Sequence, residues 1–250
     1  NGFLPEINSE VNDLSLGAGL RAKFGVWNAD LSYVYGINTF DFNITNSVNY
    51  TEALTTANFK KEFDAGGLTF RQGTLNLDVS RRYDIMHGLN VALGGEFRQD
   101  GFAIRAGDNL SWSNLNPASG VAAGAQVFPG FLPTNAIDST RNIVAAYVDI
   151  EQDFSSKFMI GAAARFENYS DFGSTLNGKV STRYKILDKL SIRASASTGF
   201  RAPSQQQKYF SKTSTVFLSQ GGNLVPVEAG TFTNYSKPAE LLGINPLKEE

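Results

Sequence analysis

One stretch near the C-terminal end restricts the fold more than any other feature of the sequence. Between Leu190 and Phe200, apolar and polar residues alternate strictly over eleven positions. One face carries Leu190, Ile192, Ala194, Ala196, Thr198 and Phe200, and the other carries Ser191, Arg193, Ser195, Ser197 and Gly199. Because successive side chains of a strand point to opposite sides, the pattern predicts a strand with one apolar and one polar face. Pro203 lacks an amide donor, so we expect regular pairing to stop near Arg201.

The same alternation occurs in seven earlier segments of the chain. It covers residues 13–24, 30–38, 74–80, 89–98, 144–151, 158–167 and 176–186. The connections are predicted to be short turns near 25–28, 84–88, 153–157 and 187–189, long loops at 39–66 and 107–139, and a medium loop at 168–175. After Arg201 the alternation is lost, and an irregular tail is predicted. Since short and long connections alternate, we expect the turns at one end of the sheet and the long loops at the other.

The predicted fold class is all-β, with about eight antiparallel up-and-down strands of a transmembrane β-barrel. Apolar bands of about nine to eleven residues and connections of alternating length are typical of such barrels. The up-and-down order also lets every backbone polar group pair with a neighbouring strand, as the bilayer requires. Aromatic residues near the ends of the bands, such as Trp27 and Phe166, suit a girdle at the lipid headgroups. Alternation alone is equally compatible with a soluble antiparallel sheet that buries one face.

The composition argues against several other classes of protein. Charged residues make up 18% of the chain and the net charge is −2, which provides no basic surface for nucleic acid. The sequence has no cysteine for a disulfide or a thiolate metal site, and its only histidine, His87, lies in a predicted turn without other metal ligands nearby. Neither a phosphate-binding Gly-rich loop nor a nucleophile motif occurs in the sequence. We therefore expect no enzyme, no cofactor and no metal site.

Charged residues gather on the polar faces of the strands predicted near the C-terminal end. They are Asp149, Glu151, Arg165, Glu167, Lys179, Arg183, Lys185 and Arg193. In a barrel these side chains would line the lumen. Opposite charges on adjacent antiparallel strands attract, so a charge ladder that stabilises the wall is the favoured interpretation. Direct contact with a transported substrate is the alternative.

Three short segments resemble motifs of the TonB-dependent outer-membrane receptors. The run STGFRAPS at 197–204, followed by Gln206 and Tyr209, resembles the GFRAP…Q signature of that family. The run RFENYSDFG at 165–173 resembles the segment that precedes this signature. The run NPLKEE at 245–250 resembles the box that follows it, although its spacing is one residue shorter and a Glu replaces a Pro. The three segments stand in the order of the family, and the resemblance covers most of the chain.

The resemblance implies that residues 1–250 are a segment of a larger, 22-stranded barrel. Its strands would span about 12–201, and residues 202–250 would form an extracellular loop. In this family an N-terminal plug closes the barrel and the TonB complex acts on the N-terminal part. Neither plug nor TonB box is recognisable in this sequence, so we expect the chain to be a fragment of a longer receptor.

The resemblance further implies a location in the outer membrane of a Gram-negative bacterium, in contact with its lipid. It implies the capture of a scarce ligand such as a ferric siderophore, cobalamin or a glycan, and TonB-driven uptake of that ligand into the periplasm. Two competing functions remain. One is a self-contained eight-stranded barrel with a structural or adhesive role, and the other is a soluble β-barrel binding module.

Two segments, 107–139 and 204–244, are predicted to capture the ligand. They lack apolar periodicity and should bury little core, and loops on a rigid scaffold commonly carry recognition. Together with Arg201, their aromatic and amide side chains offer stacking surfaces and hydrogen bonds for a planar chelate or a sugar. The candidate residues are Trp112, Phe128, Phe131, Arg201, Gln205, Gln206 and Tyr209. An alternative of equal weight is that these loops pack only on each other and bind no ligand.

Overall fold

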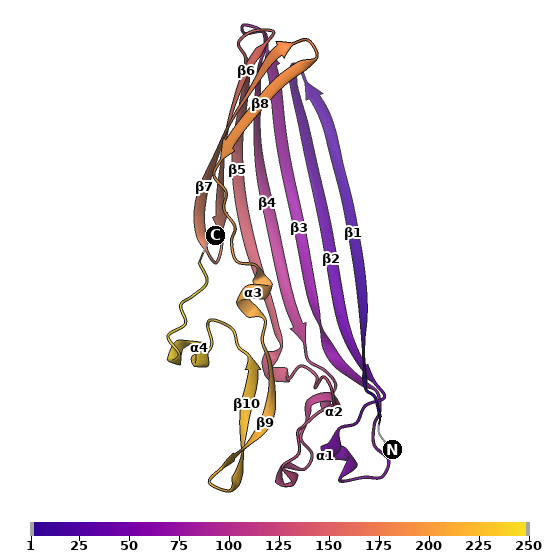
Figure 1. Cartoon of the computed structure of the whole chain (residues 1–250). Coiled ribbons are helices and arrows are strands. Elements are labelled where there is room, and N and C mark those ends of the chain that lie inside the picture. Colours follow the sequence, from indigo (N-terminus) through magenta and orange to yellow (C-terminus); the bar gives the residue numbers. More distant parts are fainter. Residues whose placement is uncertain (1–2, 249–250) are drawn as a thin grey trace.

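Eight antiparallel strands form one sheet in chain order, which confirms the predicted topology (Figure 1). The computed structural model describes residues 3–248. The strands are β1 (Glu6–Phe24), β2 (Trp27–Thr45), β3 (Phe63–Tyr83), β4 (Leu89–Arg105), β5 (Ile137–Asp153), β6 (Phe158–Tyr169), β7 (Gly173–Leu187) and β8 (Leu190–Ser197). β1 and β8 are the two edges, so the strands make an open, curved wall. We call the end with the tight turns the turn end, and the opposite end the loop end.

Several strands extend further toward the loop end than predicted. β2 continues to Thr45 and β3 begins at Phe63, so their connection is 46–62 instead of 39–66. The medium loop predicted between β6 and β7 is only a short turn from Tyr169 to Gly173. The apolar bands seen in the sequence therefore correspond to only part of each long strand.

The sequence pattern does not reveal the loop-end parts of the long strands, because the polar and apolar faces of each strand exchange there. In β2, Phe40, Phe42 and Ile44 lie on the same face as Asp30 and Asn38, since the ladder to β1 has no irregularity. This face is therefore polar toward the turn end and apolar toward the loop end. The outer face changes in the opposite sense. A pattern that requires apolar residues on one fixed face of the strand therefore ends where the two faces exchange.

β4 and β5 show the same exchange. Phe102, Ile104 and Ile143 are buried on the inner face at the loop end. On the outer face at this level, the Gln99 side-chain amide donates to the Asn142 side chain at 3.0 Å. Polar side chains thus replace apolar ones on the outside, which is expected where the wall leaves lipid and enters water.

A β-bulge in β3 adjusts the inner face at the loop end. Between two successive pairs of the ladder, β3 contains one residue more than β2. Gly66 supplies a positive φ of 92°, and a Cβ at this position would overlap the carbonyl oxygen of Arg105. Beyond the bulge Phe63 pairs with Ile44, and both side chains are buried.

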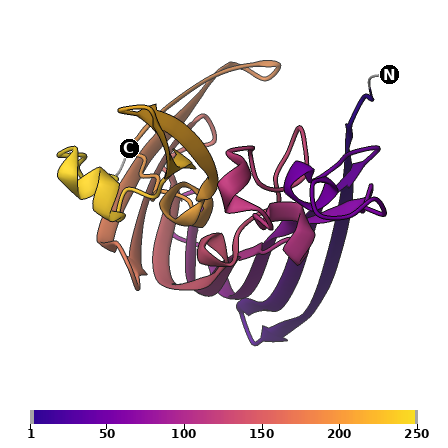
Figure 2. The ribbon, with the colours of Figure 1, turned by 90° about the horizontal axis from the view of Figure 1, so that it is seen from below.

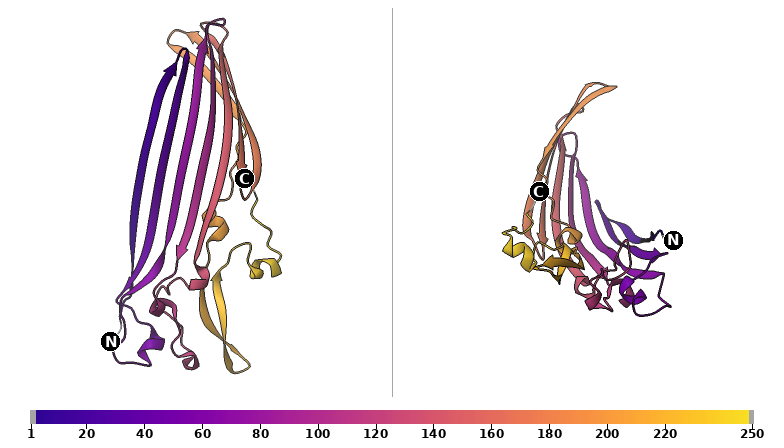
Figure 3. Two further views of the ribbon diagram at one scale, coloured as in Figure 1. Left: turned by 180° about the vertical axis from the view of Figure 1, so that it is seen from behind. Right: turned by 60° about the horizontal axis from the view of Figure 1, so that its bottom comes forward.

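The outer face of the sheet is the convex side of the wall (Figure 3), and it carries a continuous apolar belt. Its exposed side chains include Leu14, Leu16, Leu20, Leu31, Leu75, Leu93, Val144, Ile150, Ile160, Val180 and Ile192. Near the turn end Trp27 and Tyr83 meet edge to face with ring centroids 6.4 Å apart, and the Arg81 guanidinium lies 4.2 Å from the Tyr83 ring centroid. The ten steps from Trp27 to Ile37 extend about 33 Å along the strand, which for the usual strand tilt gives a belt about 25 Å tall. This height matches the hydrocarbon layer of an outer membrane.

The two long connections fold against each other on the concave side of the loop end (Figure 2). They contain α1 (Tyr50–Ala53), α2 (Asn109–Trp112) and the 3-10 helices η1 (Pro117–Ser119) and η2 (Pro133–Asn135). Asn49 forms an isolated bridge with Ala125. Its side-chain amide donates to the carbonyl oxygens of Leu110 and Ser113, each at 2.9 Å. These contacts confirm that both long loops lie at the same end of the sheet.

The tail after β8 is more regular than predicted. β8 ends at Ser197, before Arg201. Residues 202–250 were expected to form an irregular loop, but they contain α3 (Gln205–Tyr209), the hairpin strands β9 (Lys212–Gln220) and β10 (Asn223–Thr231), and α4 (Lys237–Leu241). A capping box starts α3, in which the Ser204 Oγ accepts from the Gln207 amide at 3.1 Å and the Gln207 Oε1 accepts from the Ser204 amide at 2.8 Å. None of the helices within residues 3–248 combines the length and apolar character that a membrane crossing needs.

Neighbouring residues of β6 offer a direct test of the two faces. Ala162 lies in an outer-face row with Ile150 and Val180, whereas Ala163 lies in an inner-face row with Asp149. We expect Ala162→Arg to lower the free energy of unfolding by about 2–4 kcal/mol, because the charge would face the middle of the lipid layer. Ala163→Arg should cost far less. Urea unfolding of the protein in lipid vesicles measures both values, and equal costs would contradict the assignment of faces.

Candidate ligand-binding surface

The inner face of β5–β8 carries every charged residue that the sequence assigned to the lumen. Directly paired residues of an antiparallel ladder share a face, and the register aligns the predicted positions in rows. From the loop end to the turn end, the rows are Ala145, Glu167 and Thr175; Tyr147, Arg165 and Asn177; Asp149, Ala163, Lys179 and Ser197; Glu151, Gly161, Ser181 and Ser195; Asp153, Met159, Arg183 and Arg193; and Lys185 and Ser191. The register thus places the eight predicted side chains on one face of the sheet.

Arg165 joins β4 and β6 through two carboxylates on the inner face. Its guanidinium contacts Glu96 at 3.1 Å and Glu167 at 2.7 Å. Arg98 extends the network, with nitrogens 3.4 Å from Asp100 and 3.9 Å from Glu96. Such contacts between strands are those of a stabilising charge ladder. The three β4 residues were not among the predicted lumen residues, although the alternation of β4 already placed Glu96 and Arg98 on its polar face.

A basic group on β7 and β8 has a different character. It consists of Lys179, Arg183, Lys185 and Arg193. Arg183 stands directly opposite Arg193 in the ladder, and like charges in that arrangement repel. Within the described part of the chain, the group forms one ion pair, from Arg183 to Asp153 at 3.2 Å. A hollow of about 420 Å³ lies beside it, so these cations are accessible to water or to another molecule.

The long loops bury two apolar clusters at the loop end. The first contains Ile44, Phe63, Ala65 and Ala125, and the second contains Phe102, Ile104 and Phe131, with Phe42, Phe128, Tyr209 and Phe210 packed around them. Phe131 is only 1% exposed, and Phe128 stacks on Phe42 with ring centroids 4.9 Å apart. The expectation that segment 107–139 buries little core is therefore wrong. Its aromatic residues meet the inward-facing apolar side chains of β2–β4.

The other predicted ligand residues lie in varied environments. The half-buried Trp112 donates its Nε1 hydrogen to the carbonyl oxygen of Gly107 at 3.1 Å. Gln205 is buried, and its Oε1 accepts from the Ser139 hydroxyl at 3.1 Å. The side chains exposed to solvent are those of Arg201 and Gln206, and Tyr209 is half-buried.

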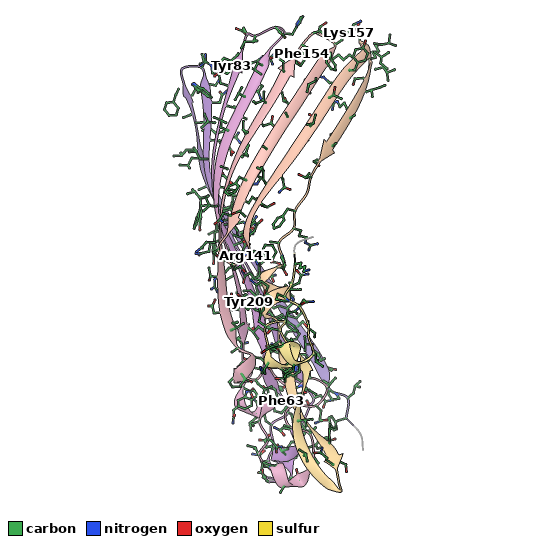
Figure 4. The ribbon with its side chains drawn as sticks, turned by 90° about the vertical axis from the view of Figure 1, so that its left-hand side faces the viewer. Phe63, Tyr83, Arg141, Phe154, Lys157 and Tyr209 are labelled. Carbon is green, nitrogen blue, oxygen red and sulfur yellow. The ribbon has the colours of Figure 1, made fainter. Side chains whose placement is uncertain are left out.

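A buried ion cluster ties the tail to the wall. Asp171, in the turn between β6 and β7, accepts from Arg141 of β5 at 2.7 and 3.0 Å, and from Lys208 of α3 at 2.5 Å. The side chains of Arg141 and Lys208 are 4% and 6% exposed. Burial alone would raise the pKa of the Asp171 carboxyl, but the hydrogen bonds from Arg141 and Lys208 outweigh burial and lower this pKa below its ordinary value of 3.8. Arg141 and the neighbouring Tyr209 of α3 are labelled in Figure 4. We call Arg141, Asp171 and Lys208 the Asp171 cluster.

A pocket of about 610 Å³ lies at the loop end, between η2, α3 and the segments that flank the β9–β10 hairpin. Its lining consists of Leu132, Thr134, Asn135, Ala136, Ile137, Tyr209, Ser211, Thr213, Phe232, Thr233 and Ser236. We call it the loop-end pocket. Only Tyr209 among its lining residues was a sequence candidate, because the pocket is assembled from segments far apart in the chain.

The sequence matches the family described as TonB dependent receptor-like, beta-barrel, over residues 3–236. The chain belongs to the TonB-dependent receptor family. Members of this family are proteins of the Gram-negative outer membrane, which confirms the predicted location and explains the apolar belt. A comparison with curated proteins gives no match.

Solved structures of two TonB-dependent receptors have similar folds. The siderophore receptor PirA from Acinetobacter baumannii aligns with a TM-score of 0.56 and 13% identity, over 88% of this chain and 30% of the PirA chain. The RagAB peptide transporter aligns with a TM-score of 0.55 and 10% identity, over 91% of this chain and 26% of its own chain. At such identities the similarity shows the fold alone. The chain spans less than a third of the length of either structure.

Asp171→Asn should release α3 from the wall of the receptor. The substitution leaves Arg141 and Lys208 buried without their carboxylate, and breaking a buried ion pair costs on the order of 3–5 kcal/mol. We expect the tail to open while the strands stay folded. Limited proteolysis within residues 198–212 measures the opening, and Asp188→Asn in the exposed β7–β8 turn is the matched control. Equal protection of the tail in both variants would refute this role of the cluster.

The wild-type tail should open in acid. Because the pKa of Asp171 is lower in the folded state, its stabilising contribution is fully present above the ordinary pKa of 3.8 and is lost as the pH falls through the lower folded-state value. Proteolytic protection of the tail, measured with an acid-stable protease, should be constant from about pH 7 to 5 and decline below about pH 4. Asp171→Asn should show no such decline. A tail that stays protected at the lowest pH would contradict the expectation.

Proposed function

We propose that this chain forms part of the wall and the ligand-capturing end of an outer-membrane receptor that imports a scarce ligand. The observation that carries the proposal is the position of both long loops and the tail, which bend over the concave, polar face at one end (Figure 2). A ligand captured by these segments would already stand at the mouth of the polar lumen. The rigid wall holds the segments in place, as scaffolds of recognition loops commonly do.

The ligand is proposed to be of the ferric siderophore, cobalamin or glycan type, as the family resemblance implies. PirA is described as a siderophore receptor and RagAB as a peptide transporter, so similar barrels serve different cargoes. Of the candidate residues, Arg201, Gln206, Tyr209 and Trp112 retain exposed surface for a ligand. Phe131 and Gln205 are buried and support the loops instead.

Energy for uptake is proposed to come from the TonB complex, through a part of the receptor outside these strands. The charged inner face would line the path of the ligand, and the apolar belt would contact lipid. We propose a binding and transport role without catalysis. No group of three or more acidic or histidine side chains within residues 3–248 is arranged to hold a metal ion.

The open order of the sheet argues against the alternative of a self-contained eight-stranded barrel. Closure would require β1 to pair with β8, yet these two strands are opposite edges of the sheet. We propose that further strands of a larger barrel complete the wall, which agrees with the greater length of the two similar structures.

Shortening two loop-end segments tests the proposed function. We expect removal of residues 115–121 and 214–229 from the intact receptor to reduce ligand uptake by about tenfold or more, because loops supply the recognition surface. These deletions spare both apolar clusters and the Asp171 cluster, so the barrel should remain folded, as shown by heat-modifiable gel mobility. Uptake of ferric siderophores, cobalamin and oligosaccharides is measured in cells with and without TonB.

The control for this experiment is replacement of the turn at 84–88 by a Gly-Ser turn at the opposite end. It should leave uptake unchanged. A folded double deletion with undiminished uptake, or uptake of no ligand that depends on TonB, would overturn the proposed function.

A further inference from the structure

The loop-end pocket distinguishes between the ligand classes of the proposed function, because its lining carries no charged side chain. Its volume of about 610 Å³ lies within the roughly 300–1,000 Å³ of typical ligand pockets. An anionic ferric chelate is bound most readily where cationic side chains replace its lost hydration. The lining of this pocket offers such a ligand no counter-charge.

Two lysines near the pocket have their ammonium groups engaged by other partners. Ser211 and Thr213 line the pocket, whereas Lys212 between them points to the other side, as alternation in a strand requires. The Lys212 ammonium donates to the Pro129 carbonyl oxygen at 2.8 Å and lies 4.3 Å from the Phe128 ring centroid. The Lys208 ammonium of α3 is engaged by the Asp171 carboxylate.

The pocket is instead rich in hydroxyl groups. They belong to Thr134, Tyr209, Ser211, Thr213, Thr233 and Ser236. Each hydroxyl can donate one hydrogen bond and accept others, so such a lining matches a ligand whose own hydroxyls both donate and accept. The buried Asn135 side chain orients two of them, donating to Thr213 Oγ1 at 3.1 Å and Ser211 Oγ at 3.4 Å. Among the described hydrogen bonds, none involves the hydroxyls of Thr134, Thr233 or Tyr209, which leaves these groups for a ligand.

Two aromatic rings complete the pocket. Tyr209 packs against the cluster of Phe102, Ile104 and Phe131, which fixes the position of its ring. Phe232 lines the pocket and is 37% exposed. Aromatic faces bind apolar C–H surfaces, while hydroxyls beside them bind the polar rim of the same ligand. A sugar ring presents both kinds of surface.

We propose that the loop-end pocket binds a neutral, polyhydroxylated ligand, namely one or more uncharged sugar rings of a glycan. The inference rests on the proposed function and selects one of its three ligand classes. Capture occurs at the pocket, before the ligand reaches the charged inner face. Since α3 supplies Tyr209, the Asp171 cluster holds one wall of the pocket in place.

The test uses the intact receptor purified in lauryldimethylamine oxide, a detergent without a sugar headgroup. The probes are an array of neutral hexose and N-acetylhexosamine oligosaccharides, with ferric enterobactin, ferric citrate and cyanocobalamin for comparison. Tyr209→Phe removes one hydroxyl and keeps the ring, Thr134→Val removes a second hydroxyl, and Phe232→Ala removes an aromatic face. Matched controls are Tyr50→Phe in α1 and Phe154→Ala at the turn end, both exposed.

We expect at least one neutral oligosaccharide to bind the wild type and both controls. Each pocket variant should weaken that binding by about threefold to tenfold, which is the scale of one hydrogen bond or one aromatic contact. Heat-modifiable mobility verifies that every variant is folded. Binding of no neutral oligosaccharide, or neutral binding that the pocket variants leave unchanged, overturns the proposal. TonB-dependent uptake of only an iron chelate or cobalamin would overturn it while upholding the proposed function, whereas the absence of any TonB-dependent uptake would overturn the proposed function itself.

Discussion

The dependence of side-chain polarity on height along the strands is the constraint on which the rest of the structure depends. Within lipid, every backbone amide and carbonyl must be paired, which strands of a continuous ladder achieve. The two-residue period then forces each strand to choose an outer and an inner set of side chains. In the belt the outer set is apolar, and the inner set faces water. Beyond Ile37 the outer set becomes polar, and the inner set is free to be apolar.

The inward-facing apolar side chains above the lipid attach the long loops to the wall. Phe42, Ile44, Phe102 and Ile104 face inward only where the strands have left the lipid, and the long loops supply Phe128 and Phe131 to cover them. The loops are therefore folded onto the wall by ordinary burial of apolar surface. The tail is attached partly in the same way, through Tyr209 and Phe210, and partly by the ion pairs of the Asp171 cluster. A buried ion cluster is costly to desolvate but demands one geometry, which suits a segment whose position matters more than its stability.

The sequence was sufficient for the strands and their faces but not for the structures built on them. Alternation located the eight strands because the outer residues in lipid are uniformly apolar. It failed beyond Asn38, where the period of two persists and the polarity is reversed. Other local signals were present in the tail, where Ser204 and Gln207 form a capping box and Gly221-Gly222 provides the turn between β9 and β10.

The candidate site was less predictable for a physical reason. Arg141, Asp171 and Lys208 come from three separate segments, and nothing in one sequence indicates that they meet. The loop-end pocket likewise combines residues near 134, 211 and 233, whose proximity is decided by tertiary packing. Aromatic content alone could not separate Phe131, which is buried in the core, from Tyr209, which is only half-buried. Burial is a property of the folded neighbourhood and not of residue type.

The exchange of faces also marks the depth at which the receptor sits in the membrane. The row at Ile37 marks where lipid contact ends, so the rim above it stands in water as a rigid collar that carries the loops. Adding two residues to each strand above this row would raise the collar by about 5 Å for the usual strand tilt and leave every side chain on its own face. Adding one residue would turn the collar inside out, exposing its apolar side chains and burying its polar ones. Receptors of this architecture can therefore vary the height of their long loops above the membrane in steps of two residues, while the part in lipid stays unchanged.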